Sequence, residues 1–152
     1  MAEIKKMDPA GLLFLGNEEG CVLHPYLDAV GVPTIGYGNT YYEEGKRVTM
    51  KDPSITKTRA LELFKNILDH YEKTVWSVTR DDINQHQFNA LVSLSYNIGT
   101  GGFKSSTVLK RVNINPSDVT IKQAFEMWRN AEGKKGILLE RRKREWRMYF
   151  EW

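Results

Sequence analysis

The strongest constraint on the fold is residues 22–42, a segment broken up by glycine and proline between two stretches of helical periodicity. Its short β-prone pieces are separated by Pro25, Gly31, Pro33, Gly36 and Gly38. Such residues end strands and form tight turns, so the segment predicts a small sheet of about three short strands. No other part of the sequence predicts a convincing sheet, and the rest of the fold is expected to be helical.

Helical signals lie on both sides of this segment. Asp8 followed by Pro9 is typical of a helix start and Gly20 of a helix end, which predicts a helix over residues 9–19. After Thr56, apolar residues recur at spacings of three and four and predict a long helix of about five turns. Further helices are expected from Asp82 or Asn84 to a glycine loop at Gly99, Gly101 and Gly102, near residues 106–112, over residues 118–130, and at the C-terminus.

These elements predict an α+β fold, mostly helical, with a small N-terminal β-hairpin region and a cleft between two lobes. We expect one domain over residues 1–152, and a chain of this length can bury a core without disulfides or metal ions. The single cysteine, Cys21, has no partner for an intrachain disulfide. The expected lobes are a β-containing lobe over residues 14–60 and a helical lobe formed by residues 1–13 and 80–152, joined by a helix over residues 61–79.

The excess positive charge is concentrated at the C-terminus. The chain has 22 basic and 19 acidic residues, and residues 134–152 alone hold seven basic and three acidic ones, a net charge of +4. Either this segment attracts an anionic surface or it is an ordinary solvated helix face. Nucleic-acid binding is disfavoured, because aromatic residues are not interleaved with a basic stripe.

No segment predicts a membrane anchor or a signal peptide. The apolar run at residues 12–15 is too short, and the longer uncharged run at residues 83–103 is interrupted by polar residues and glycines. We therefore expect no membrane insertion and a protein that stays in the cytosol until something releases it.

Three residues around the predicted sheet could carry chemistry. Glu19 ends the helix at residues 9–19, where the negative end of the helix dipole favours a protonated carboxyl. Asp28 lies in a turn and is expected to be ionised, and Thr34 lies on a strand where its hydroxyl could hold a water. Two carboxyls in such different surroundings are typical of a general acid and a base. From spacing alone, however, ordinary roles at a helix end, in a turn and on a strand are the more common interpretation.

The residues themselves resemble the tailed-phage lysozymes, the endolysin muramidases. The family pattern of Glu-Gly, Tyr-x-Asp and Gly-x-x-Thr-Ile-Gly-Tyr-Gly is similar to residues 19–20 and 26–40. Residues 96–107 resemble the segment Asn-x-Gly-x-Gly-x-Phe-x-x-Ser, and residues 124–128 and 136–145 resemble the last two motifs. Four motifs in the correct order cover nearly the whole chain, which makes chance similarity a poor explanation.

The resemblance implies a lysozyme-like fold and a glycoside hydrolase that cuts the β-1,4 bond between N-acetylmuramic acid and N-acetylglucosamine in peptidoglycan, for cell lysis in a phage cycle. It implies that Glu19 protonates the glycosidic oxygen, that Asp28 activates the attacking water and that Thr34 helps to place it. Cleavage with inversion requires the two carboxyls to be about 6.5–9.5 Å apart. Glu18 is an alternative acid, but only Glu19 gives the family's nine-residue step to Asp28.

The same resemblance implies that Thr40, Tyr96 and Ser106 line the sugar cleft and that Arg141 contacts the catalytic glutamate. Tyr96 could equally be a core aromatic, and Ser106 a helix cap. Asn39 stands where many relatives have histidine, which predicts an effect on stability and not on catalysis.

No cofactor or metal is expected, because the three histidines lack the spacing of metal ligands. The expected partner is bacterial peptidoglycan, met by a monomer that is held in the host cytoplasm until it is released to the cell wall. A non-catalytic peptidoglycan-binding module and a lytic transglycosylase on the same fold are the alternatives.

Overall fold

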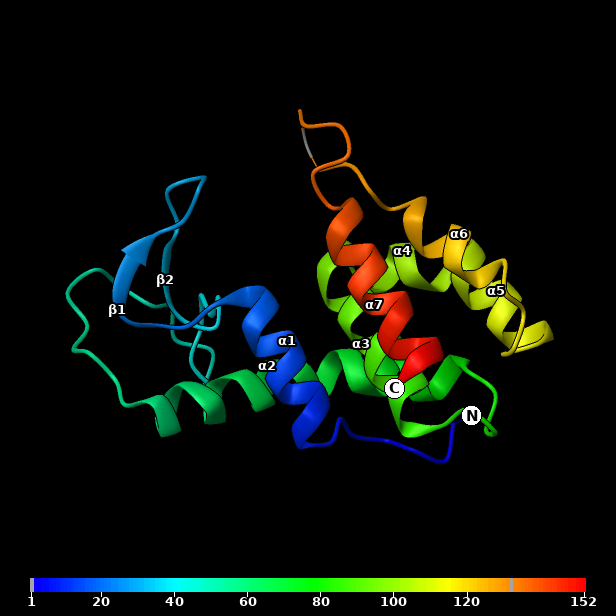
Figure 1. Cartoon of the computed structure of the whole chain (residues 1–152). Helices are drawn as coiled ribbons and strands as arrows, with labels where there is room; N and C mark the ends of the chain where they lie inside the picture. Colours follow the sequence, from blue (N-terminus) through cyan, green and yellow to red (C-terminus); the bar gives the residue numbers. More distant parts are fainter. Residues whose placement is uncertain (1, 132) are drawn as a thin grey trace. The chain divides into compact units, whose positions relative to one another are not determined.

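The computed structural model describes residues 2–131 and 133–152, which form seven helices and one two-stranded antiparallel sheet (Figure 1). This confirms the predicted α+β class. The chain divides into two compact units, one made of residues 12–70 and the other of residues 71–152 with the N-terminal segment up to Gly11. In chain order the elements are α1 Pro9–Glu19, β1 Val22–Leu27, β2 Pro33–Gly36, α2 Lys57–Val78, α3 Gln85–Ile98, α4 Thr100–Lys104, α5 Thr107–Ile114, α6 Ile121–Glu126 and α7 Leu139–Glu151.

The sheet contains two strands where three were predicted. β1 and β2 pair with Val22 opposite Gly36, Tyr26 opposite Thr34 and Leu27 opposite Pro33. The β-prone piece beyond them forms only isolated bridges, 35 with 39 and 41 with 47. Gly36 and Gly38 have φ angles of 68° and 88°, so the chain turns back too sharply for a third strand to pair along its length.

The sheet unit has its own small core. Ile35, Val48 and Leu63 are buried together, and Tyr37 stacks on Phe64 with ring centroids 4.6 Å apart. These contacts join the strand region to the first half of α2.

Asn39 is part of this interior. Its side chain is 3% exposed, and its Nδ2 donates to the carbonyl oxygen of Leu63 at 3.2 Å. The residue expected to affect stability therefore ties the loop after β2 to α2.

The helical unit is built around α3, which runs beside α7 (Figure 1, green and red). Asn84 caps α3, since its side chain accepts from the Gln87 backbone N–H while the Gln87 side chain accepts from the Asn84 N–H. This resolves the choice between Asp82 and Asn84 in favour of Asn84. Among the described residues, no helix is both long and apolar enough to cross a bilayer.

The C-terminal helix buries part of its charge. Glu145 and Arg142 of α7 are fully buried, with Arg142 Nε 2.7 Å from Glu145 Oε1, and the Ser93 hydroxyl donates to Glu145 Oε2. Burial raises the pKa of Glu145, and the charges of Arg142 and Arg141 oppose this shift. The predicted basic segment is therefore not one solvated face, because two of its arginines point into the unit.

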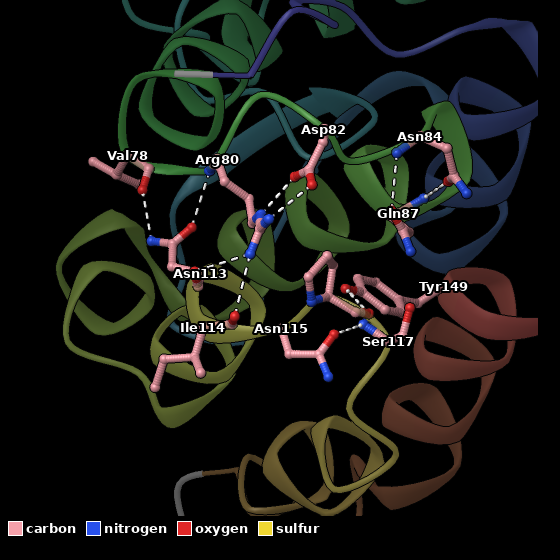
Figure 2. A network of polar contacts seen from close by, with 11 residues as sticks. Val78, Arg80, Asp82, Asn84, Gln87, Asn113, Ile114, Asn115, Ser117 and Tyr149 are labelled. Carbon is pink, nitrogen blue, oxygen red and sulfur yellow. Dashed lines mark hydrogen bonds and ion pairs between the residues drawn. The ribbon is translucent and has the colours of Figure 1, made fainter.

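A polar network joins the ends of several helices in this unit (Figure 2). Arg80, just after α2, pairs with Asp82 at 2.8 Å and donates to the backbone carbonyls of Asn113 and Ile114 at the end of α5. The Asn113 side chain donates back to the Val78 carbonyl at 2.9 Å. These bonds satisfy carbonyl groups that the helix ends leave without partners.

The predicted glycine loop is partly wrong. Only Gly99, with φ at 91°, ends α3, whereas Gly101 and Gly102 lie inside the short helix α4. A Cβ on Gly102 would lie 3.2 Å from the Trp128 ring, so the small residue allows this indole to approach. The spacing of glycines did not distinguish a turn from a close helix contact. The helix predicted over residues 118–130 is shorter, at Ile121–Glu126.

Two helical glycines should respond oppositely to alanine. A Cβ on Gly11 would lie 2.4 Å from Cγ of the fully buried Asn89, which itself bonds Asp8 and Gln85, whereas a Cβ on Gly101 meets nothing within 4 Å. We expect Gly11→Ala to lower the free energy of unfolding by about 1–3 kcal/mol and Gly101→Ala to leave it unchanged or raise it by up to about 1 kcal/mol. Urea titrations measure both, and equal effects would contradict the described packing around Asn89.

Candidate active site

Asp28 forms the turn that joins the two strands. The Asp28 backbone N–H donates to the Val32 carbonyl at 3.0 Å, and the Asp28 carbonyl accepts from the Gly31 N–H at 3.0 Å. Its side-chain Oδ1 accepts from the backbone N–H groups of Val30 and Val32, both at 2.9 Å. Aspartate is favoured in such turns because its short carboxylate reaches nearby backbone donors. Gly31 has a φ of 84°, which suits glycine at this point of the turn.

These bonds use only one oxygen of the carboxylate. Asp28 is half-buried, and within the described residues its Oδ2 makes no hydrogen bond. The turn thus fixes the orientation of the carboxylate while one oxygen stays available to an incoming molecule.

Thr34 is held by the same turn. It lies on β2, is 3% exposed, and donates its hydroxyl proton to the Val32 carbonyl at 2.8 Å. Because that proton is engaged, the hydroxyl oxygen can act toward another molecule only as an acceptor. Val32 therefore connects the two residues, with its N–H on Asp28 and its carbonyl on Thr34.

Glu19 is the last residue of α1 and is half-buried. The helix ends there because Gly20, with φ at 75°, donates its N–H back to the Gly16 carbonyl at 2.9 Å. The chain then enters β1, so Glu19 lies at the junction of helix and sheet.

Tyr26 links the three residues. Burial raises the pKa of the Tyr26 phenol, and the charges of Asp28 and then Glu19 raise it further. Both carboxyls therefore lie within electrostatic reach of one phenol. Thr34 is the register partner of Tyr26 in the antiparallel pair, so their side chains share a face of the sheet. Tyr26 was not among the site residues predicted from the sequence, although its place in the Tyr-x-Asp pattern was the available signal.

The remaining predicted residues lie in both units. Thr40 is half-buried in the sheet unit, where its carbonyl accepts from the Val48 N–H at 2.9 Å. Tyr96, on α3 in the helical unit, has its ring centroid 4.9 Å from that of Tyr71. A sugar contact by either residue stays a prediction.

Ser106 and Arg141 have structural partners in the helical unit. The Ser106 hydroxyl donates to the Phe103 carbonyl at 2.7 Å and accepts from the Leu109 N–H at 3.1 Å, so Ser106 caps α5. Arg141 is 8% exposed, and its Nε donates to Glu145 at 3.2 Å. The predicted alternative role of Ser106 as a helix cap is therefore confirmed. A sugar contact by Ser106 stays a prediction.

The described residues contain no candidate metal centre. In residues 2–131 and 133–152, no group of three His, Cys, Asp or Glu side chains is arranged to hold a metal ion.

Comparisons with known proteins agree over nearly the whole chain. The family model described as phage lysozyme matches residues 16–145. The endolysin of Salmonella phage P22 is 39% identical over 135 residues, covering 89% of this chain and 91% of that protein. The solved endolysin of Escherichia coli O157:H7 phage FAHEc1 is 31% identical, with a TM-score of 0.90 and coverage of 99% of this chain and 97% of that one. The solved muramidase domain of SpmX from Asticaccaulis excentricus is 31% identical, with a TM-score of 0.76 and coverage of 96% and 98%. The predicted lysozyme-like fold is confirmed.

The turn geometry predicts different effects for two substitutions of Asp28. Asparagine keeps an acceptor oxygen for the Val30 and Val32 N–H groups, whereas alanine removes it. We expect Asp28→Asn to change the free energy of unfolding by less than about 0.5 kcal/mol and Asp28→Ala to lower it by about 1–2 kcal/mol. Urea titrations of the two variants and the parent chain measure the difference. Equal stability of the two variants would contradict the structural role assigned to Oδ1.

Proposed function

The chain belongs to the phage lysozyme family, and we propose that it is a muramidase that hydrolyses the β-1,4 bond between N-acetylmuramic acid and N-acetylglucosamine, with inversion. Family membership gives a peptidoglycan-lytic, lysozyme-like function. The proposal adds the bond, the reaction and the residues that carry it.

One observation supports the proposal: Asp28 and Thr34 are both hydrogen-bonded to the backbone of Val32, and each has an acceptor oxygen to spare. A water molecule held by two acceptors donates one proton to each and turns its lone pairs away from them. This is the orientation that a nucleophilic water needs. The SpmX muramidase domain gives independent support, since it is similar over 96% of this chain.

In the proposed reaction, the water donates one hydrogen bond to Asp28 Oδ2 and the other to Thr34 Oγ1. Its oxygen attacks the anomeric carbon of the muramic acid while the bond to the glycosidic oxygen breaks. Glu19 gives its proton to that oxygen, so the leaving sugar departs as an alcohol, and Asp28 takes a proton from the water. Attack on the face opposite to the leaving group inverts the configuration, and the water requires a carboxyl separation of about 6.5–9.5 Å.

The two alternatives differ from this reaction in what they require. A lytic transglycosylase closes an internal anhydro ring and has no need for a nucleophilic water, and a binding module needs neither acid nor base. The spare acceptors on Asp28 and Thr34 favour hydrolysis over both. A sugar contact by Thr40 is part of the same proposal, because Thr40 belongs to the unit that holds Asp28.

Replacing Glu19 by glutamine should remove the general acid with little change in shape. We expect Glu19→Gln to slow the release of glycan fragments by about 10²–10⁴-fold. The measurement is mass analysis of digested peptidoglycan, in which the parent chain should give fragments with muramic acid at a free reducing end. A product lighter by one water would identify a transglycosylase.

Glu18→Gln is the matched control, because it makes the same change one residue earlier on α1. We expect it to keep the parent rate within a few-fold, provided that circular dichroism shows it folded. Full activity of Glu19→Gln together with loss in Glu18→Gln would assign the acid to Glu18 and contradict the proposal.

Thr34 should be replaceable by serine but not by valine. Serine keeps both the donor to Val32 and the acceptor for water, whereas valine keeps the shape and loses both. We expect Thr34→Val to lower kcat by about 10²-fold with KM nearly unchanged, since the lost contact is to the nucleophile and not to the bound sugar. Thr34→Ser should stay within about tenfold of the parent kcat. Equal kcat values for both variants would show that the hydroxyl does not hold the water.

A further inference from the structure

A concave surface adjoins the candidate site. A pocket of about 230 Å³ lies between the start of β2 and the loop that follows Thr40. One of its walls is Val32, whose backbone binds both Asp28 and Thr34. The pocket is therefore separated by a single residue, Val32, from the two side chains that are proposed to bind the nucleophilic water.

The lining of this pocket has an apolar and a polar part. Val32, Val48 and Met50 supply apolar surface, and Met50 is 49% exposed. The polar part consists of Thr40, Thr49 and Arg47. A volume below the roughly 300–1,000 Å³ of pockets for drug-sized ligands suits one sugar ring or one side arm of a sugar.

The loop that forms the pocket is held in place before any ligand binds. Asp52 accepts hydrogen bonds from the Tyr42 hydroxyl at 2.6 Å, the Thr49 N–H at 3.0 Å and the Thr49 hydroxyl at 2.6 Å. Bonds from Thr49 and Tyr42 lower the pKa of Asp52 to about 2. The pKa of Asp52 is lower in the folded than in the unfolded chain, so ionised Asp52 stabilises the loop at ordinary assay pH. This stabilisation is lost only as the pH falls toward about 2.

Arg47 is oriented by an aromatic side chain and not by an acid. Its Nε donates to the Tyr41 hydroxyl at 3.1 Å, and its guanidinium carbon lies 5.3 Å from the centre of the Tyr41 ring. Within the part of the chain that the structure describes, no carboxylate pairs with Arg47. In the same unit, Arg59 binds Glu43 through both of its terminal nitrogens. The terminal N–H donors of Arg47 are therefore not paired with any carboxylate among the described residues and are available to one from a ligand.

We propose that this pocket is a subsite for the muramic acid unit of the glycan and that Arg47 pairs with a carboxylate on its 3-O-lactyl side arm. The inference rests on the proposed function, because it places this sugar beside the water-holding turn. The acetamido methyl group meets the apolar wall, and the Thr40 hydroxyl is available to the sugar's polar groups. The carboxylate is either the free lactyl group or one in the attached stem peptide.

Kinetics on paired substrates test this role. Glycan strands carrying stem peptides are compared with the same strands after their carboxyl groups have been converted to neutral amides, using the parent chain and Arg47→Met. We expect Arg47→Met to raise KM about five- to tenfold on the charged strands, with kcat unchanged, and to match the parent KM on the amidated strands. Strands stripped of peptide but retaining lactyl carboxylates identify the source of the charge, and a KM effect on either kind of charged strand supports the pairing.

Lys51→Met is the matched control, since it removes one exposed positive charge beside Met50, which lines the pocket. It should leave KM within about twofold on every substrate, because general attraction between charges at the surface is weak. Equal KM values for Arg47→Met and the parent on charged strands, or the same rise on amidated strands, would overturn the proposal. If the parent chain released no fragments at all, the proposed function would fail instead, so the two failures are distinguishable.

Discussion

The candidate site depends on one carboxylate oxygen that accepts two backbone hydrogen bonds. Asp28 Oδ1 holds the N–H groups of Val30 and Val32, which closes the turn between β1 and β2 and sets the register that brings Thr34 opposite Tyr26. The same Val32 orients the Thr34 hydroxyl through its carbonyl. A single turn thereby fixes the proposed base, Asp28, and the proposed water ligand, Thr34, relative to each other. Rigid placement of this kind removes the entropy cost of arranging the groups during the reaction.

The pocket beside the candidate site is also held in place by hydrogen bonds within the chain. The turn that orients Asp28 also supplies a wall of the surface where Arg47 lies, and Asp52 holds the other side of that surface in place. Charged residues occur in two different settings in the molecule. Glu145 and Arg142 neutralise each other inside the helical unit, whereas Arg47 is left without an acidic partner among the described residues. A solvent-facing cation beside an aromatic ring is suited to recognition.

Local signals in the sequence predicted much of the fold. Asp8, Pro9 and Gly20 bounded α1 correctly, and a cap at Asn84 was one of two predicted starts for α3, because caps depend on neighbours within a few residues. The third strand and the loop at Gly101 and Gly102 were wrong, since each depends on how distant segments approach. Glu19, Asp28 and Thr34 were named from the sequence. The importance of Val32 lies in its backbone hydrogen bonds, and that of Arg47 in the lack of an acidic partner among the described residues. Neither property can be read from residue type.

Asp28 and Thr34 are proposed to direct a water to the face of the sugar opposite to the leaving group. The most direct measurement is the configuration of the newly formed reducing end, observed by proton NMR on peptidoglycan fragments before mutarotation equilibrates the anomers. Inversion of a β-1,4 bond predicts that the α anomer appears first. First appearance of the β anomer would mean retention through a second displacement and would contradict the roles assigned to Asp28 and Thr34.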